Sequence, residues 1–239
     1  PEKIIFNGVG KTAQALTLAI ERGIRAINID SFGEIETIAA LARQAGKKVP
    51  IGIRLQTGTG WAGQFGFPLR NGHAIEAARC IASTPELQFC GLHFHLGTQL
   101  TQSHYYCEAI GAALGFAAEI RRCCSLETRF LDIGGGFGVP TVRGLTERDR
   151  QLLNRHAIAP PAPLPEACPA PEVLLQDIFT CIAERCDGLG LDTPKVFLEP
   201  GRLLSSTAQI LVSSISDIKE LPSGRTAAIA DAGINIAHP

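Results

Sequence analysis

The chain has 239 residues, of which 45% are hydrophobic and 19% are charged, and this composition excludes disordered and collagen-like chains. Its 22 basic residues nearly balance 23 acidic ones, so no basic surplus indicates a nucleic-acid partner. Charged residues break the apolar runs well short of a membrane span. The chain has no methionine and opens with Pro1, and we therefore expect it to be a piece of a longer protein.

Strand-like runs alternate with helical patterns along the chain. Strands are expected at residues 3–6, 26–29, 49–55, 87–96, 129–133 and 195–198. Helices are expected at residues 12–22, 73–82, 105–123 and 172–185, and another should carry Ile35 and Ile38 and end at Gly46. Six such β/α units predict an α/β protein with a parallel sheet.

Polar or glycine-bearing segments recur where the expected strands end. They include Asn7-Gly8, Asp30-Ser31, Arg54, His95, Gly134–Gly136 and Glu199–Arg202. In a (β/α)8 barrel of the TIM type these ends converge on one face, where the active site lies. We therefore favour a barrel, although periodicity alone does not exclude an open doubly wound sheet.

Two stretches depart from this alternation. Residues 140–171 are rich in proline and show no clear periodicity, which is typical of a functional lid or a flexible insertion. From residue 204 onward, extended runs at 210–212, 215–218 and 227–229, with turn residues at 222–224, predict a β-rich region. We expect a barrel over residues 1–203 and the start of a second domain over 204–239.

The eight cysteines form no Cys-x-x-Cys motif, and most of them fall inside apolar patterns. This usage favours a reducing, cytoplasmic setting over a disulfide framework.

The segment Gly8-Val9-Gly10-Lys11-Thr12 follows a strand and opens a helix, as a phosphate-binding P-loop does. The full motif requires a glycine where Ile5 stands, so nucleotide hydrolysis is disfavoured. The favoured interpretation is a helix N-terminus with Thr12 near the cap.

His93 and His95 lie on one face of a strand, because side chains alternate along it. A barrel hydrolase could use this pair for a divalent metal, but later strand ends offer no clear further ligands. We expect no metal, with one histidine packed internally and the other facing a planar ligand.

Two strand ends carry groups suited to an anionic ligand. The amides of Gly134, Gly135 and Gly136 can form an anion-binding concavity, although a tight turn explains the triplet equally well. Glu199 and Arg202 either form a surface ion pair or bind a ligand with a basic ring nitrogen and a phosphate.

Taken together, four segments resemble the pyridoxal-phosphate-dependent ornithine/diaminopimelate/arginine decarboxylase family of alanine-racemase-like fold. They are residues 4–8, 91–98, 131–138 and 198–202, and they occur in the family's order over nearly the whole chain. The resemblance implies a (β/α)8 barrel followed by a β domain, in a homodimer with the active site at the subunit interface. The barrel would be incomplete here, with its first strands missing.

The resemblance also implies which residues bind pyridoxal 5'-phosphate. His95 would lie flat on the pyridine ring, Glu199 would pair with the ring nitrogen, and Arg54 would lie near the phenolic oxygen. The phosphate would be bound by Thr98, Gly134, Gly135, Gly136, Gly201 and Arg202. No catalytic residue is expected in this chain, because the Schiff-base lysine should lie upstream of Pro1.

The implied reaction is decarboxylation of a basic or diamino amino acid. A carboxylate such as Glu199 keeps the ring nitrogen protonated, which strengthens the cofactor as an electron sink and favours decarboxylation over racemisation. Two alternatives remain, a racemase or epimerase of the same fold and a non-catalytic pyridoxal-phosphate-binding protein. We expect the chain alone to be inactive.

Overall fold

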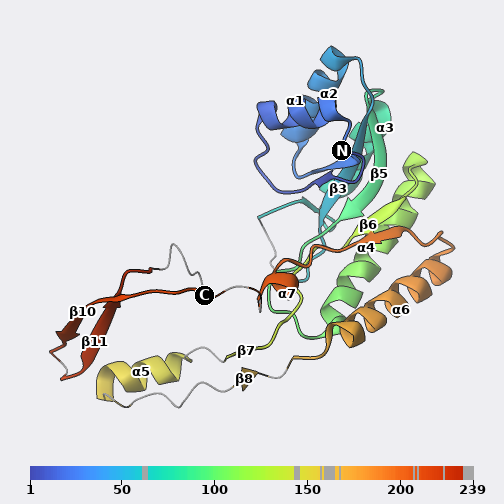
Figure 1. Cartoon of the computed structure of the whole chain (residues 1–239). Coiled ribbons are helices and arrows are strands. Elements are labelled where there is room, and N and C mark those ends of the chain that lie inside the picture. The colour runs from blue at the N-terminus through green and yellow to red at the C-terminus, as the bar shows by residue number, and fades with distance from the viewer. Residues whose placement is uncertain are drawn as a thin grey trace. The chain divides into compact units, whose positions relative to one another are not determined.

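The computed structural model describes residues 1–60, 64–142, 146–156, 158, 165–166, 168–206, 208, 210–222 and 224–233 (Figure 1). The chain divides into two compact units. The first contains Pro1–Gly138 and Pro169–Gly201, and the second contains Val139–Cys168 and Arg202–Pro239.

The first unit is built on a parallel sheet whose strand order follows the chain. The order is β1 (Ile5–Phe6), β2 (Ala26–Ile29), β3 (Val49–Gln56), β5 (Leu87–His93), β6 (Phe130–Asp132) and β9 (Lys195–Phe197), with β4 (Phe67–Pro68) paired to β3. A doubly wound sheet reverses its strand order part-way, whereas a barrel adds each strand beside the previous one. The predicted partial TIM-type barrel is therefore confirmed, and the open sheet is not.

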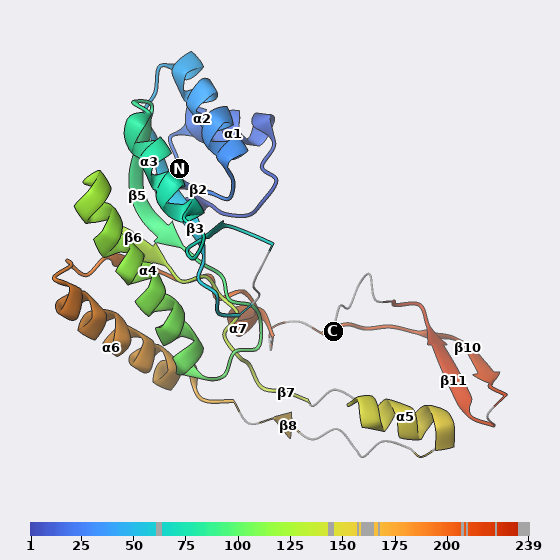
Figure 2. The ribbon, with the colours of Figure 1, turned by 180° about the vertical axis from the view of Figure 1, so that it is seen from behind.

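Helices connect successive strands and contact each other in the same sequence. They are α1 (Ala13–Arg22), α2 (Phe32–Ala45), α3 (His73–Ser83), α4 (Ser103–Cys124) and α6 (Pro171–Leu189). Each of these helices contacts the next, and Figures 1 and 2 show α4 and α6 running side by side. A row of neighbouring helices of this kind is the outer layer that right-handed β/α connections produce.

Local sequence signals account for the helix boundaries. Thr12 caps α1 by accepting from the Ala15 N–H at 3.2 Å, and Ser31 caps α2 by accepting from the Glu34 N–H at 3.3 Å. α2 ends at Gly46, whose φ of 61° is left-handed and suits glycine. The predicted cap at Thr12 is confirmed.

The core lies between the strands and these helices. All four residues of β2 are buried, and the buried residues of α1 are Leu16, Ala19 and Ile20. Their spacing of three and four residues is the periodicity from which this helix was predicted.

The second unit contains short elements, some of which the sequence did not predict. In residues 140–171, β7 (Thr141–Val142) pairs antiparallel with β8 (Pro165–Glu166), and α5 (Glu147–His156) lies between these two strands in the sequence. A lid or a flexible insertion was predicted there, and helix α5 was not. This helix is composed mainly of charged and polar helix formers, so no apolar stripe revealed it. Residues 143–145, 157, 159–164 and 167 lie outside the described part.

The β-rich region predicted after residue 204 is only partly present. β10 (Ile215–Glu220) and β11 (Thr226–Ala230) form an antiparallel hairpin, and the turn residue Gly224 donates its N–H to Leu221 at 2.8 Å. Residues 210–212 lie outside any strand, and the unexpected helix α7 (Gly201–Ser205) precedes them. Residues 207, 209, 223 and 234–239 lie outside the described part.

All eight cysteines are free thiols, in agreement with the prediction from their spacing. Within the described residues, no helix combines the length and the apolar character that a membrane crossing requires.

Candidate functional site

Polar side chains from five strands meet at the carboxyl end of the parallel sheet in the first unit. Two amides, one imidazole and two carboxylates form this cluster, which consists of Asn7, Asn28, His93, Asp132 and Glu199. Because the carboxyl ends of parallel strands share one edge, residues up to 192 positions apart are brought into contact.

The amide of Asn7 joins the two carboxylates. Its Nδ2 donates to Asp132 Oδ2 at 3.1 Å and also to Glu199 Oε1. Its Oδ1 accepts a hydrogen bond from Asn28 Nδ2. Both functions of the Asn7 amide are therefore used within the cluster.

The two histidines lie on either side of Glu199 but differ in exposure. His93 Nε2 is 3.6 Å from Glu199 Oε1, and His95 Nδ1 is 3.6 Å from Oε2. His93 is 1% exposed, and among the described residues neither of its ring nitrogens has a hydrogen-bond partner. The side chain of His95 is 28% exposed. As predicted, one histidine packs internally, and the other is accessible.

Burial separates the ionisation of these groups. Desolvation lowers the pKa of His93 to about 3, so this imidazole is neutral. Desolvation, reinforced by the nearby Glu199 charge, raises the pKa of Asp132 to about 6. Burial also tends to raise the pKa of Glu199, but its contacts with His95, His93 and Asn7 outweigh this and lower it. Glu199 therefore remains ionised when Asp132 takes up a proton.

The glycine loop after β6 packs tightly against neighbouring backbone. A Cβ at Gly135 would lie 2.0 Å from the Glu199 carbonyl oxygen, and a Cβ at Gly136 would lie 2.1 Å from that of Gly97. The N–H of Gly134 donates to Asp132 Oδ1 at 3.0 Å, and that of Gly135 donates to His95 Nδ1 at 3.2 Å. Two of the three amides predicted to bind phosphate thus have acceptors within the chain, and their phosphate role stays a prediction.

The other predicted cofactor residues are spread more widely. Thr98 is exposed beside Gly136, since a Cβ on this glycine would lie 3.5 Å from Thr98 Cα. Arg54, on β3, has its Nε 3.8 Å from Asp30 Oδ1. Gly201 and Arg202 are exposed at the start of α7, and Arg202 belongs to the second unit. Within the first unit the structure therefore brings His95, Glu199 and the glycine loop together, and the cofactor roles of Thr98, Arg54, Gly201 and Arg202 stay predictions.

Lys11, the lysine of the P-loop-like segment, is used inside the first unit. Its Nζ contacts Glu34 Oε2 at 3.0 Å and the Gly8 carbonyl at 2.7 Å, and its side chain is only 1% exposed. A lysine in this position is unavailable for a nucleotide phosphate, which agrees with the disfavoured nucleotide interpretation.

The cluster also contains a set of possible metal ligands. His93, Asp132 and Glu199 each offer one ligand atom, and these atoms lie within 4.8 Å of one another. Imidazole and carboxylate groups are ligands that zinc accepts. However, the amide hydrogens of Asn7 already point at both carboxylates, so a cation would have to displace them.

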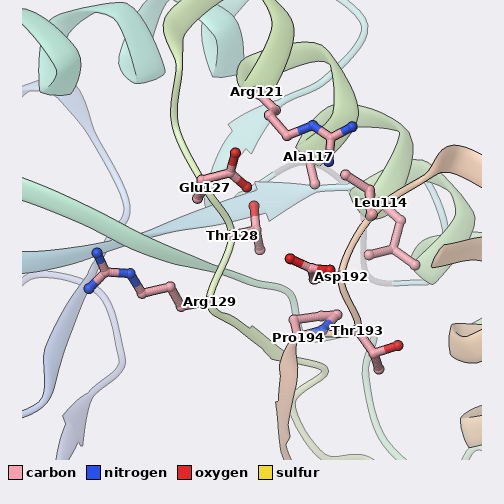
Figure 3. A pocket seen from close by; sticks show the side chains of 10 residues that line it. Leu114, Ala117, Arg121, Glu127, Thr128, Arg129, Asp192, Thr193 and Pro194 are labelled. Carbon is pink, nitrogen blue, oxygen red and sulfur yellow. The ribbon is translucent and has the colours of Figure 1, made fainter.

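A separate cavity of about 250 Å³ lies at the amino ends of β6 and β9 (Figure 3). The side chains of Arg121, Glu127, Thr128 and Asp192 surround it. It is thus at the opposite end of the strands from the cluster. In TIM-type barrels the chemistry lies at the carboxyl end, so we do not assign the site to this cavity.

Comparison with known proteins shows the family of the chain. The family model described as pyridoxal-dependent decarboxylase, pyridoxal binding domain, matches residues 1–206. The chain belongs to this family. The diaminopimelate decarboxylase of Bacillus subtilis is 27% identical over 98% of the chain and 51% of the relative, and that of Methanocaldococcus jannaschii is 28% identical over 98% and 50%. The chain thus spans about half the length of these curated relatives.

Solved structures show the same likeness. The crystal structure of diaminopimelate decarboxylase from M. jannaschii in complex with L-lysine is 26% identical. It matches with a TM-score of 0.79 over 98% of this chain and 51% of that one. The fold expected from the resemblance is therefore confirmed for the pyridoxal-binding domain.

The residues of the cluster fit pyridoxal phosphate, the cofactor of pyridoxal-dependent decarboxylases. Glu199 is ionised and its side chain is 33% exposed, so it can meet a protonated ring nitrogen. His95 lies beside it with an accessible ring, and the loop at Gly134–Gly136 carries no side chains that would block a phosphate.

Sequence reasoning did not identify Asn7, Asn28, His93 and Asp132 as parts of this site. Asn7 was noted only as a polar residue at a strand end, and Asp132 only as part of the segment 131–138. Asn28 was the stronger signal, because it is a buried polar residue within an otherwise apolar strand.

Proposed function

We propose that the protein is a pyridoxal-phosphate-dependent carboxy-lyase that releases CO2 from a basic or diamino amino acid. The observation that carries this proposal is the ionised carboxylate of Glu199, held beside the accessible His95 at the carboxyl end of the sheet. The relatives named diaminopimelate decarboxylase, one of them solved with L-lysine, support the substrate class.

Pyridoxal phosphate, when bound, supplies an electron sink for the electron pair left at Cα when the carboxyl group departs. Glu199 would hold a proton on the pyridine nitrogen, since a neighbouring carboxylate favours the cationic form of that ring. His95 would face the ring. Arg54, restrained by Asp30, would face the phenolic oxygen. Charge of this kind at the ring nitrogen favours decarboxylation over racemisation.

The test compares the unaltered protein with a Glu199→Gln variant, which keeps the shape of the side chain and removes its charge. Binding of pyridoxal phosphate is measured with the chain itself. Release of CO2 from carboxyl-labelled diamino and basic amino acids is measured with the full-length protein that contains this chain. We expect the variant to lower the rate of CO2 release by about 100-fold, as removal of a charged partner in a buried site does.

Two rival outcomes would overturn the assignment. Exchange of enantiomers without CO2 release would identify a racemase or epimerase of the same fold. Cofactor binding without turnover of any amino acid would identify a non-catalytic pyridoxal-phosphate-binding protein.

A metal-dependent hydrolase is a second candidate, favoured by the ligand atoms of His93, Asp132 and Glu199. Elemental analysis of the purified protein for zinc and manganese distinguishes the two. If the protein contains stoichiometric zinc or manganese and the Asp132→Asn variant does not, the metal-dependent hydrolase would replace the decarboxylase as the proposed function.

We further propose that the protein acts in the cytoplasm as a homodimer. Its pyridoxal-binding domain would comprise residues 1–203, with 140–171 inserted, and a β-rich domain would start at 204. Light scattering tests the dimer, and limited proteolysis tests the boundaries through cleavage within 140–171 and near 204.

A further inference from the structure

Asn7 does not occur among the residues expected to contact the cofactor, yet it makes the most connections in the cluster. Its two amide hydrogens are directed at oxygens of two different carboxylates, Asp132 and Glu199. These carboxylates come from neighbouring strands and would repel each other if both were ionised without a shared donor.

A side-chain amide can be turned by 180° without a change of shape, and the wrong orientation would point its oxygen at both carboxylates. Asn28 favours the orientation seen here, because its Nδ2 donates to Asn7 Oδ1 and so leaves the amide hydrogens of Asn7 facing the carboxylates, although Asn28 Oδ1 itself has no hydrogen-bond partner among the described residues. Asn28 is 1% exposed and fits only because Gly52 on the adjacent strand has no side chain. A Cβ at Gly52 would lie 1.8 Å from Asn28 Oδ1.

We propose that Asn7 is a positioning residue for Glu199, holding this carboxylate and Asp132 together through one amide whose orientation Asn28 sets. That Glu199 meets the ring nitrogen of the cofactor is part of the proposed function, and this proposal rests on it. The arrangement of Asn7, Asn28, Asp132 and Glu199 does not rest on it.

The groups that face this pair come from several elements. His93 at the end of β5 is neutral, and His95 lies on the loop that follows. Arg54 on β3 and Lys11 before α1 place positive charge near His93. The hydrogen bonds from Asn7 stabilise the ionised carboxylates. Their contribution lowers the pKa of Glu199, and it opposes the rise in the pKa of Asp132 that burial causes.

The first experiment follows the ionisation of Asp132 and Glu199 in the chain by NMR of carboxyl groups labelled with ¹³C. Loss of the donors in Asn7→Ala should raise both titration midpoints by about half to one pH unit, the equivalent of one hydrogen bond each. Thr128→Val, at the opposite end of the strands, is the control and should leave both midpoints unchanged. Unchanged midpoints in Asn7→Ala would overturn the proposal.

A second variant keeps the test decisive if Asn7→Ala does not fold. Asn28→Val removes the orienting donor but leaves the Asn7 amide in place. It should shift the midpoints of Asp132 and Glu199 upward together, by less than Asn7→Ala. Midpoints that stay at the unaltered values would show that Asn28 does not orient the amide, contrary to the proposal.

The second experiment measures binding of pyridoxal 5'-phosphate and of its analogue in which carbon replaces the ring nitrogen. The unaltered chain should bind the natural cofactor more tightly, and Asn7→Ala should reduce this ratio several-fold while leaving binding of the analogue unchanged. If the unaltered chain binds the cofactor and the analogue equally well, Glu199 does not act on the ring nitrogen and that part of the proposed function fails. The NMR titration would still decide whether Asn7 positions Glu199. An undiminished ratio in Asn7→Ala would contradict the positioning role.

Discussion

The two ends of the parallel sheet are both polar, but their polar groups are connected in different ways. At the carboxyl end, Asn7 joins two carboxylates and is itself oriented by Asn28. At the amino end, the side chains lie around a cavity of about 250 Å³ (Figure 3). There Arg121 donates to the Gly190 carbonyl, but the buried Thr128 hydroxyl has no partner among the described residues. Hydrogen bonds that fix one another specify a geometry, as binding sites require, whereas isolated polar groups do not.

The largest effect that distinguishes the two ends should come from the glycine loop. In Gly135→Ala the new methyl group would meet the Glu199 carbonyl oxygen at 2.0 Å, so the loop or Glu199 must move. We expect a loss of about 3 kcal/mol in the free energy of unfolding, typical of overpacking, together with weaker cofactor binding. Denaturant titration measures the first and equilibrium binding the second.

Gly188→Ala in α6 is the matched control, because an added Cβ there meets nothing within 4 Å. It should leave stability unchanged or raise it slightly, as alanine is the better helix former. If Gly135→Ala and Gly188→Ala had the same stability, the tight packing of the glycine loop at the carboxyl end would not contribute to stability.

The next effect concerns the neutral His93. Its pKa of about 3 in the folded protein is below that of a free histidine, so on acidification the unfolded chain takes up a proton that the folded one does not. The contribution of His93 to stability is therefore fully present above about pH 6.5 and falls as the pH is lowered. This contribution should fall by about 2 kcal/mol between pH 6.5 and 5, and the raised pKa of Asp132, which acts in the opposite direction, should offset part of it.

His93→Leu should abolish this loss, and no hydrogen bond to the ring is sacrificed because neither nitrogen has a partner. Urea unfolding at several pH values measures it. The same replacement at the exposed His104 serves for comparison and should preserve the pH dependence of the unaltered protein. An equal acid sensitivity in His93→Leu and the unaltered chain would show that His93 is not buried as a neutral group.

The smallest effect is expected at the amino end. Thr128→Val removes a buried hydroxyl that has no partner and keeps its shape, so stability should rise by about 1 kcal/mol. Cofactor binding should not change. A marked loss of binding in calorimetry would mean that the amino end contributes to function, and the contrast between the two ends would disappear.

Much of the first unit follows from its sequence, because most of its helices and strands bury apolar residues in runs that the sequence shows. The strand at 26–29 and the cap at Thr12 were predicted correctly. Helix α5 was not, since it is mostly exposed and charged and contains only two apolar residues.

The resemblance of four segments singled out His95 and Glu199, and the structure places the two side chains together, while their roles toward the cofactor stay predictions. The contribution of Asn7 depends on which strands are neighbours and on how far each extends. The same is true of Asp132, which appeared only as part of the segment 131–138. Contacts between residues 125 and 192 positions apart are not encoded in any local pattern.

The order of the strands also has a consequence for biosynthesis. From β1 to β6 each major strand pairs with the one made just before it, so the sheet can grow as the chain leaves the ribosome. β9 is the exception, because it joins β6 only after residues 133–194 have been synthesised. Glu199 arrives with β9, so the cluster can be completed only at the end of this sequence. A nascent chain arrested before β9 would already possess most of the described sheet and would still lack Glu199, the carboxylate that we propose for the ring nitrogen of the cofactor.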